Sequence, residues 1–99
     1  MEITTAENIM TVKLTGELDH HSAAPAREKV DTELVRQKPD GLVIDFSGIT
    51  FMDSSGVGFV MGRYKKASQN NCRLTVTGLS ERDKKMMKLS GIEKLAEIR

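Results

Sequence analysis

The stretch Leu42–Phe46, with the sequence LVIDF, decides the fold, and the polar turn SGITFMD over residues 47–53 follows it. A short apolar run broken by a single acid is typical of a central strand that is covered on both faces, as in parallel sheets. The next segment, from Ser54 to about Asn70, carries apolar residues at helical spacing. It predicts a helix whose core face consists of Val57, Val60, Met61, Tyr64 and Ala67.

Upstream of this unit, the sequence predicts two strands and a helix. Apolar and polar residues alternate over residues 10–14, which indicates a half-buried strand, and residues 2–6 are its predicted hairpin partner. Ser22 is a candidate helix N-cap, with Pro25 in the first turn, where a missing N–H costs nothing. This helix is expected to end near Gln37, because a Lys-Pro-Asp-Gly breaker cluster follows.

Downstream, alternation over residues 74–77 predicts another strand. Ser80, with Asp83 three residues later, resembles a capping box and opens a third predicted helix. Gly91 suits the C-terminal cap of that helix, and residues 95–98 form a last short strand. Helices alternating with strands predict one α/β domain over residues 1–99, with a mixed, mostly parallel sheet of about five strands and about three crossover helices.

Composition excludes several classes of function. Lys and Arg total 15 against 14 Asp and Glu, and aromatic residues make up only 4%. Because neither a basic surplus nor stacking residues are available, direct binding of DNA or RNA is disfavoured. The chain lacks an apolar run of about 18 residues and an apolar signal core at its polar N-terminus, so we expect a cytoplasmic protein.

Cysteine and histidine are scarce, which bears on redox and metal chemistry. The single cysteine, Cys72, excludes an internal disulfide and is expected to act as a small, partly buried apolar residue. No cluster of His and Cys has the spacing of metal ligands, so no metal is expected.

The segment FMDSSGVG, residues 51–58, carries the most information about function. It lies at the carboxyl end of a predicted parallel strand, where α/β folds place binding sites and where the first helical N–H groups lack partners. Gly56 and Gly58 each cost up to about 1 kcal/mol relative to alanine. Three interpretations are open: capping with tight helix–sheet packing, a phosphate cradle that lacks the lysine and spacing of a P-loop, or a modifiable serine on an exposed turn.

Three motifs together resemble one family. GELDHH at residues 16–21, FMDSSGVG at 51–58 and GRYK at 62–65 resemble the sporulation-type anti-sigma factor antagonists of the STAS-domain family. The resemblance implies that Ser54 is phosphorylated by the anti-sigma factor, a protein kinase that uses ATP and magnesium, and that a serine phosphatase restores the free form. Only the free form would bind the kinase and release the sigma factor. The protein itself would be a monomer without a cofactor.

The resemblance also implies a partner-binding edge around Ser54. Phe59 is expected to project away from the core face of its helix, where an apolar ring either anchors a partner or is simply an isolated exposed residue. The whole set of predicted partner-binding residues is Asp19, His20, His21, Asp53, Ser55, Gly56 and Phe59. Asp53 either positions Ser54 or caps the helix. Family members often continue into a further C-terminal helix beyond the position of Arg99.

Two other functions compete with this interpretation. A hydrolase would use Ser54 as nucleophile, a base from His20 or His21, and Asp19 or Asp45 to orient it. The sequence lacks the Gly-x-Ser-x-Gly elbow of such enzymes, so we expect no enzymatic activity. The more serious alternative is a STAS binding module within a transport or stress-signalling assembly.

Overall fold

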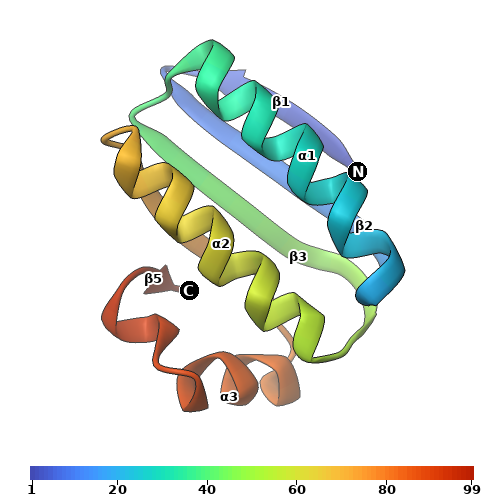
Figure 1. Ribbon diagram of the computed structural model, residues 1–99. Helices are drawn as coiled ribbons and strands as arrows, with labels where there is room; N and C mark the ends of the chain where they lie inside the picture. Colours follow the sequence, from blue (N-terminus) through green and yellow to red (C-terminus); the bar gives the residue numbers. More distant parts are fainter.

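The computed structural model describes residues 1–99 and places three helices against a five-stranded sheet (Figure 1). The sheet has the order β1-β2-β3-β4-β5, in which β1 runs antiparallel to β2 and the other neighbours are parallel. This confirms the predicted element order and sheet type. The elements are β1 (Glu2–Ala6), β2 (Ile9–Leu18), α1 (His20–Gln37), β3 (Gly41–Met52), α2 (Ser54–Gln69), β4 (Arg73–Thr77), α3 (Glu81–Leu89), a short 3-10 turn (Ile92–Lys94) and β5 (Glu97–Ile98).

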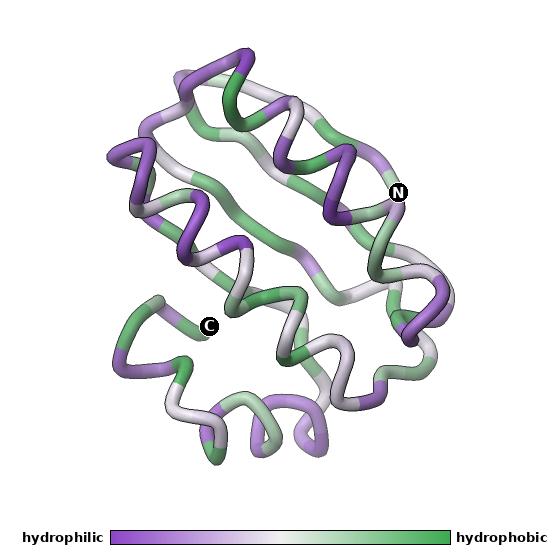
Figure 2. The backbone as a smooth tube through the Cα atoms, in the orientation of Figure 1, coloured by the Kyte–Doolittle hydropathy of each residue, from purple (hydrophilic) through white to green (hydrophobic).

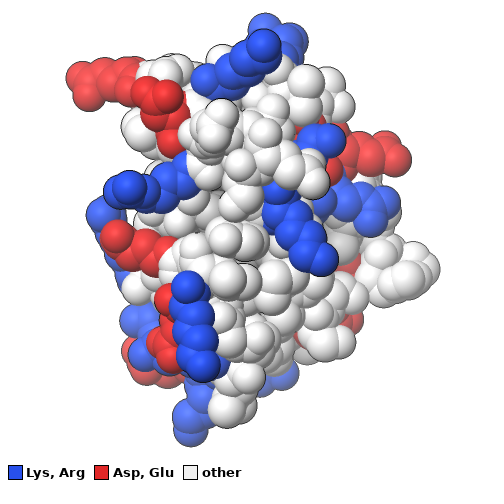
Figure 3. Space-filling view, turned by 60° about the vertical axis from the view of Figure 1, so that its left-hand side comes forward, with Lys and Arg blue, Asp and Glu red and all other residues white.

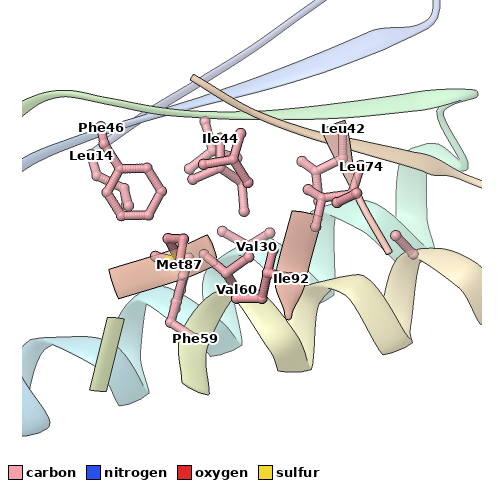
Figure 4. Close-up of a cluster of buried hydrophobic side chains, with 14 of the residues drawn as sticks. Leu14, Val30, Leu42, Ile44, Phe46, Phe59, Val60, Leu74, Met87 and Ile92 are labelled. Atoms are coloured by element: carbon pink, nitrogen blue, oxygen red, sulfur yellow. The ribbon is translucent and has the colours of Figure 1, made fainter. Parts of the chain in front are cut away.

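The core lies between the sheet and the helices, so the molecule has two layers. Alternate strand residues such as Val12, Ile44 and Val76 are fully buried in one cluster with helix residues. In Figure 4, Ile44 and Phe46 of β3 face Val60 of α2 and Met87 of α3. The helices alternate hydrophilic and hydrophobic segments from turn to turn (Figure 2). The prediction that β3 is covered on both faces is wrong, because Val43 and Asp45 on its other face are only half-buried. That face of the sheet carries mostly polar side chains.

β3 is longer than predicted, and the predicted turn over residues 47–53 is mostly strand. β2 continues beside it as far as the pair Leu18 and Met52, with two register irregularities on the way. Gly48 sits at such an irregularity, where an added Cβ would lie 2.7 Å from the Leu14 carbonyl oxygen. Glycine and serine here belong to bulged strand pairing and not to a turn, which is why the sequence signal misled.

α1 begins earlier than predicted. Its N-cap is Asp19 and not Ser22, which is instead the third residue of a capping box: Ser22 Oγ accepts from the Asp19 N–H at 3.0 Å. Pro25 therefore lies in the second turn and not the first. For α3 the predicted cap and end are confirmed, since Ser80 Oγ accepts from the Asp83 N–H and Gly91 follows the helix with a φ of +86°. The capping box is only half formed, because the Asp83 carboxylate contacts Arg82 and not the Ser80 N–H.

α2 has two buried sides where one was predicted. Val60 and Ala67 are buried as expected, but Phe59 and Arg63 are also buried, with 4% exposure each. The reason is that α1 packs alongside α2 on the same face of the sheet (Figure 1). The prediction that Phe59 projects away from the core is therefore wrong, and the ring cannot anchor a partner from this buried position.

Candidate phosphorylation and partner-binding site

The helices α1 and α2 begin side by side at the carboxyl ends of two neighbouring strands, β2 and β3. Leu18 and Met52 are register partners at the ends of the parallel strands β2 and β3, and the Asp53 N–H donates to the Leu18 carbonyl oxygen at 3.4 Å. The next residue on each strand, Asp19 or Asp53, is the N-cap of the helix that follows. Parallel pairing thus brings together the two predicted segments, residues 19–21 and 53–56.

Asp53 caps α2 and leaves the serine after it free for chemistry. Asp53 Oδ1 accepts from the Ser55 N–H at 2.8 Å, so capping is the role that the geometry assigns to this carboxylate. Ser54 is the first residue of α2 and is exposed, whereas Ser55 is half-buried. A group attached to Ser54 would therefore lie at a helix N-terminus, which favours negative charge.

Gly56 holds the start of α2 close to the end of β3. An added Cβ at Gly56 would lie 2.3 Å from both Cγ and Sδ of Met52, whose side chain is fully buried. By contrast, an added Cβ at Gly58 meets nothing within 4 Å. The close approach of helix to strand therefore requires glycine at position 56. A partner could contact Gly56 only through its backbone, so the predicted contact cannot involve a side chain.

Asp19 fixes the loop that carries the two histidines. Its Oδ1 accepts from the backbone N–H groups of Ser22 and His21, each at 3.0 Å. The bond from Ser22 is the main cause that holds the pKa of this carboxyl below its ordinary value of 3.8. His20 and His21 are both exposed, with ring centroids 5.8 Å apart. The pair is therefore open to solvent at the start of α1, and His20 lines the same hollow as Ser55 of α2.

The same geometry weighs against the hydrolase alternative. The two carboxylates considered for orienting a histidine base are both engaged with backbone amides: Asp19 as described, and Asp45 through Ser47 N–H at 2.9 Å. Neither arrangement is that of a catalytic triad, in which the acid binds the imidazole of the base.

A groove runs between α1 and α2 from the site toward the middle of the helices. It has a volume of about 580 Å³ and is kept open by small residues on both helices. Its lining residues are His20, Ala23, Ala24 and Arg27 from α1, with Ser55, Gly58, Phe59, Gly62 and Arg63 from α2. A larger hollow, of about 730 Å³, lies at the opposite end of the strands beside Gly41 and Arg73 and is remote from Ser54.

Phe51 is a candidate that the sequence reasoning missed. Its side chain is 46% exposed, although Met52 beside it is fully buried. It lies on the last part of β3, opposite Glu17 of β2 and three residues before Ser54. Strand alternation counted back from the buried Met52 would have predicted an outward-facing ring, had this part of the chain been recognised as a strand.

Basic and acidic side chains are interspersed on the face shown in Figure 3, without an extended patch of one sign. None of the helices is long and apolar enough to cross a membrane. No group of three or more His, Cys, Asp and Glu side chains is arranged to hold a metal ion.

The fold is a mixed five-stranded sheet with helices on one face, and the N-termini of α1 and α2 adjoin where Ser54 of α2 is exposed. A model of the STAS domain matches residues 1–99, so the chain belongs to the STAS-domain family. It is 31% identical to the "Anti-sigma F factor antagonist" of Paenibacillus polymyxa, over 99% of this chain and 84% of that relative. The predicted family and fold are confirmed.

Two solved structures are similar over nearly the whole chain. One is the anti-sigma factor antagonist SpoIIAA in its unphosphorylated form, with 25% identity and a TM-score of 0.79, covering 99% of this chain and 86% of that one. The other is the Bacillus cell fate determinant SpoIIAA in the phosphorylated form, with 27% identity and a TM-score of 0.78, covering 99% and 89%. The same fold thus exists with and without a phosphate.

Proposed function

We propose that this protein is an anti-sigma factor antagonist that is switched off by phosphorylation on Ser54. The observation that carries the proposal is the position of Ser54, exposed as the first residue of α2 and directly after the capping Asp53. A relative named as an anti-sigma factor antagonist supports it, as do the two solved SpoIIAA structures, one unphosphorylated and one phosphorylated. The free form binds the anti-sigma factor, and the sigma factor is released.

The charge of a phosphate on Ser54 explains how phosphorylation would prevent partner binding. A phosphate adds about −1.5 to −2 charges at pH 7, and at a helix N-terminus that charge meets a favourable dipole. The fold therefore stays intact. The same charge lies beside Asp53 and Asp19, and burying it in an interface that supplies no positive partner of its own would cost several kcal/mol. Because about 1.4 kcal/mol is a tenfold change in affinity, phosphorylation abolishes binding.

The partners follow from the same proposal. The anti-sigma factor is a kinase that supplies its own ATP and magnesium, and a serine phosphatase reverses the modification, so this chain needs no cofactor. Its free form is a cytoplasmic monomer. Asp19, His20, His21, Asp53 and Ser55 contribute to the partner surface, and Phe51 takes the apolar role first predicted for Phe59.

Intact-mass measurement after incubation with the anti-sigma kinase and ATP-Mg tests the proposal. Wild type should gain one phosphate, Ser54→Ala none, and the neighbouring control Ser55→Ala one. Loss of the phosphate only in Ser55→Ala would move the switch by one residue. An unmodified wild type that still binds tightly would contradict the switch and indicate a binding module of a transport or stress-signalling assembly instead.

Calorimetric titration of the kinase completes the test. The free form should bind, and the phosphorylated form should bind at least 100-fold more weakly, as expected for a loss of about 2.7 kcal/mol or more. Backbone NMR shifts of the two forms should differ only around Ser54. Large changes elsewhere would show that phosphorylation acts by remodelling the fold.

A further inference from the structure

The end of β3 lacks a strand partner on the side that faces α3. The pairing of β3 with β4 ends at Asp45 and Thr77, whereas β3 itself continues to Met52. The Asp53 N–H points toward β2, so the carbonyl of Met52 points the other way, as alternation along a strand requires. A backbone acceptor is thus left at the strand end, directly before Asp53 and Ser54.

Arg82 supplies the donor for this carbonyl. It lies in the first turn of α3, and its Nη1 donates to the Met52 oxygen across a long 3.4 Å contact. The same Nη1 lies 3.2 Å from Oδ1 of Asp83, which is buried. Both contacts use one nitrogen, and the side chain is 66% exposed. A guanidinium has five donor hydrogens, so those on Nε and Nη2 remain for another acceptor.

The phosphate of Ser54 would be within reach of these donors. Consecutive Cα atoms are about 3.8 Å apart, so the Cα of Ser54 lies at most about 7.6 Å from that of Met52, whose carbonyl Arg82 already contacts. Ser54 and Arg82 are both exposed, so no packed side chain has to move. The charged and titratable side chains on the segments that adjoin this position are Glu17, Asp19, His20, His21, Asp53, Glu81, Arg82, Asp83 and Lys85.

We propose that Arg82 is a positioning residue that binds the phosphate of Ser54 and holds it against the N-terminus of α2. This inference rests on the proposed function, because Arg82 can bind the phosphate only if Ser54 is the residue that carries it. Arginine suits the task, since its planar fork binds phosphate through two parallel hydrogen bonds. The phosphate then bridges α2 and α3, and the modified serine is held on the chain instead of extending freely into solvent.

A bound phosphate titrates differently from a free one, which provides the test. We would incorporate phosphoserine at position 54 during synthesis, so that no kinase is needed, and follow its 31P signal between pH 4 and 8. Opposite charge favours the dianion, so the second pKa of the phosphate should be lower in wild type than in Arg82→Ala, by about 0.5–1 pH unit. Arg82→Lys should restore part of the shift, and the control Lys85→Ala, one turn along α3, should leave it unchanged.

Two further readouts keep the test decisive. On phosphorylation, the Nε–H resonance of Arg82 should shift in wild type and in Lys85→Ala alike, which a purely structural role would not produce. If Arg82→Ala folds poorly, Arg82→Gln serves in its place, with circular dichroism as the check. Coincident phosphate titration curves in wild type and in the Arg82 variants would overturn the inference. A kinase that leaves Ser54 unmodified would contradict only the proposed function, since the phosphate titration does not depend on it.

Discussion

The guanidinium of Arg63 on α2 pairs with the carboxylate of Asp31 on α1. Arg63 Nε lies 2.7 Å from Asp31 Oδ1, and Nη2 donates to Oδ2 at 3.1 Å. Nε–H does not point at Oδ1, so that contact is an ion pair and the hydrogen bond is the one from Nη2. Arg63 Cζ also lies 5.3 Å from the centroid of the Phe59 ring. Burial lowers the pKa of Arg63, and Asp31 opposes that shift. The pair joins the two helices whose N-termini form the site.

Removing Asp31 and removing Arg63 should lower the free energy of unfolding by different amounts. Asp31→Ala leaves a buried guanidinium unpaired and should lower the free energy of unfolding by about 3 kcal/mol. Arg63→Met removes the charge but keeps an apolar stem, and the Asp31 side chain that remains is 24% exposed. The free energy of unfolding should therefore fall less in this variant, by about 1–2 kcal/mol.

Urea unfolding of both single variants and the double variant measures the coupling between Asp31 and Arg63. We expect a coupling energy of at least about 1 kcal/mol. The exposed pair of Glu33 and Arg36 on α1 is the matched control, and removing it should leave the unfolding midpoint almost unchanged. Additive effects of the two single substitutions would show that the buried pair contributes no specific interaction.

Gly56 and Gly58 should respond oppositely to alanine. Gly56→Ala places a Cβ against the buried Met52 and should destabilise the protein by about 1–3 kcal/mol while displacing the first turn of α2. Gly58→Ala meets open space and should stabilise the helix by up to about 1 kcal/mol. Thermal unfolding of the two variants checks the signs, and equal effects would refute the close approach of Gly56 to Met52.

Alanine substitutions of Phe51 and Phe59 should have opposite main effects, the first on kinase affinity and the second on stability. Phe51→Ala removes a half-exposed ring and should weaken kinase binding tenfold or more, with a change in unfolding free energy of about 1 kcal/mol or less. Phe59→Ala empties a buried position and should cost about 3–5 kcal/mol of stability. Calorimetry and urea unfolding on both variants give the comparison. Unaltered affinity in Phe51→Ala would remove the anchor role.

Asp19 should make the N-terminus of α1 sensitive to acid. Its pKa is lowered in the folded protein, so the stability it provides is fully present above its ordinary pKa of 3.8 and is lost as the pH falls through the lower folded value. The stability difference between wild type and Asp19→Asn should therefore shrink on acidification through this window. NMR titration of the Asp19 carboxyl measures the pKa, which Ser22→Ala should move only slightly toward its ordinary value, because the substitution removes the hydroxyl but keeps the backbone N–H that lowers the pKa most. An unshifted pKa in wild type would contradict the cap.

The order of elements could be predicted from local patterns because each depends on neighbouring residues. Strand alternation, the Lys-Pro-Asp-Gly breaker before β3 and the Ser80 cap each act over a few residues. The start of α1 was misplaced because Asp19 and Ser22 are both good capping residues, and only the folded chain shows which one accepts from the free N–H groups. The length of β3 was missed because its far end is a strand only through pairing with β2.

The sequence alone determined the domain, the mixed sheet, the family and the serine at the start of α2, since motif spacing and hydrophobic periodicity carry that information. Tertiary structure decided which side chains face the partner. A helical wheel gives one apolar stripe, but α2 packs against both the sheet and α1, so Phe59 is buried. Phe51 is exposed because it follows the strand alternation at the end of β3, next to the buried Met52. The contacts between Arg63 and Asp31 and between Arg82 and Met52 join residues about 30 positions apart, and only folding brings such groups within bonding distance.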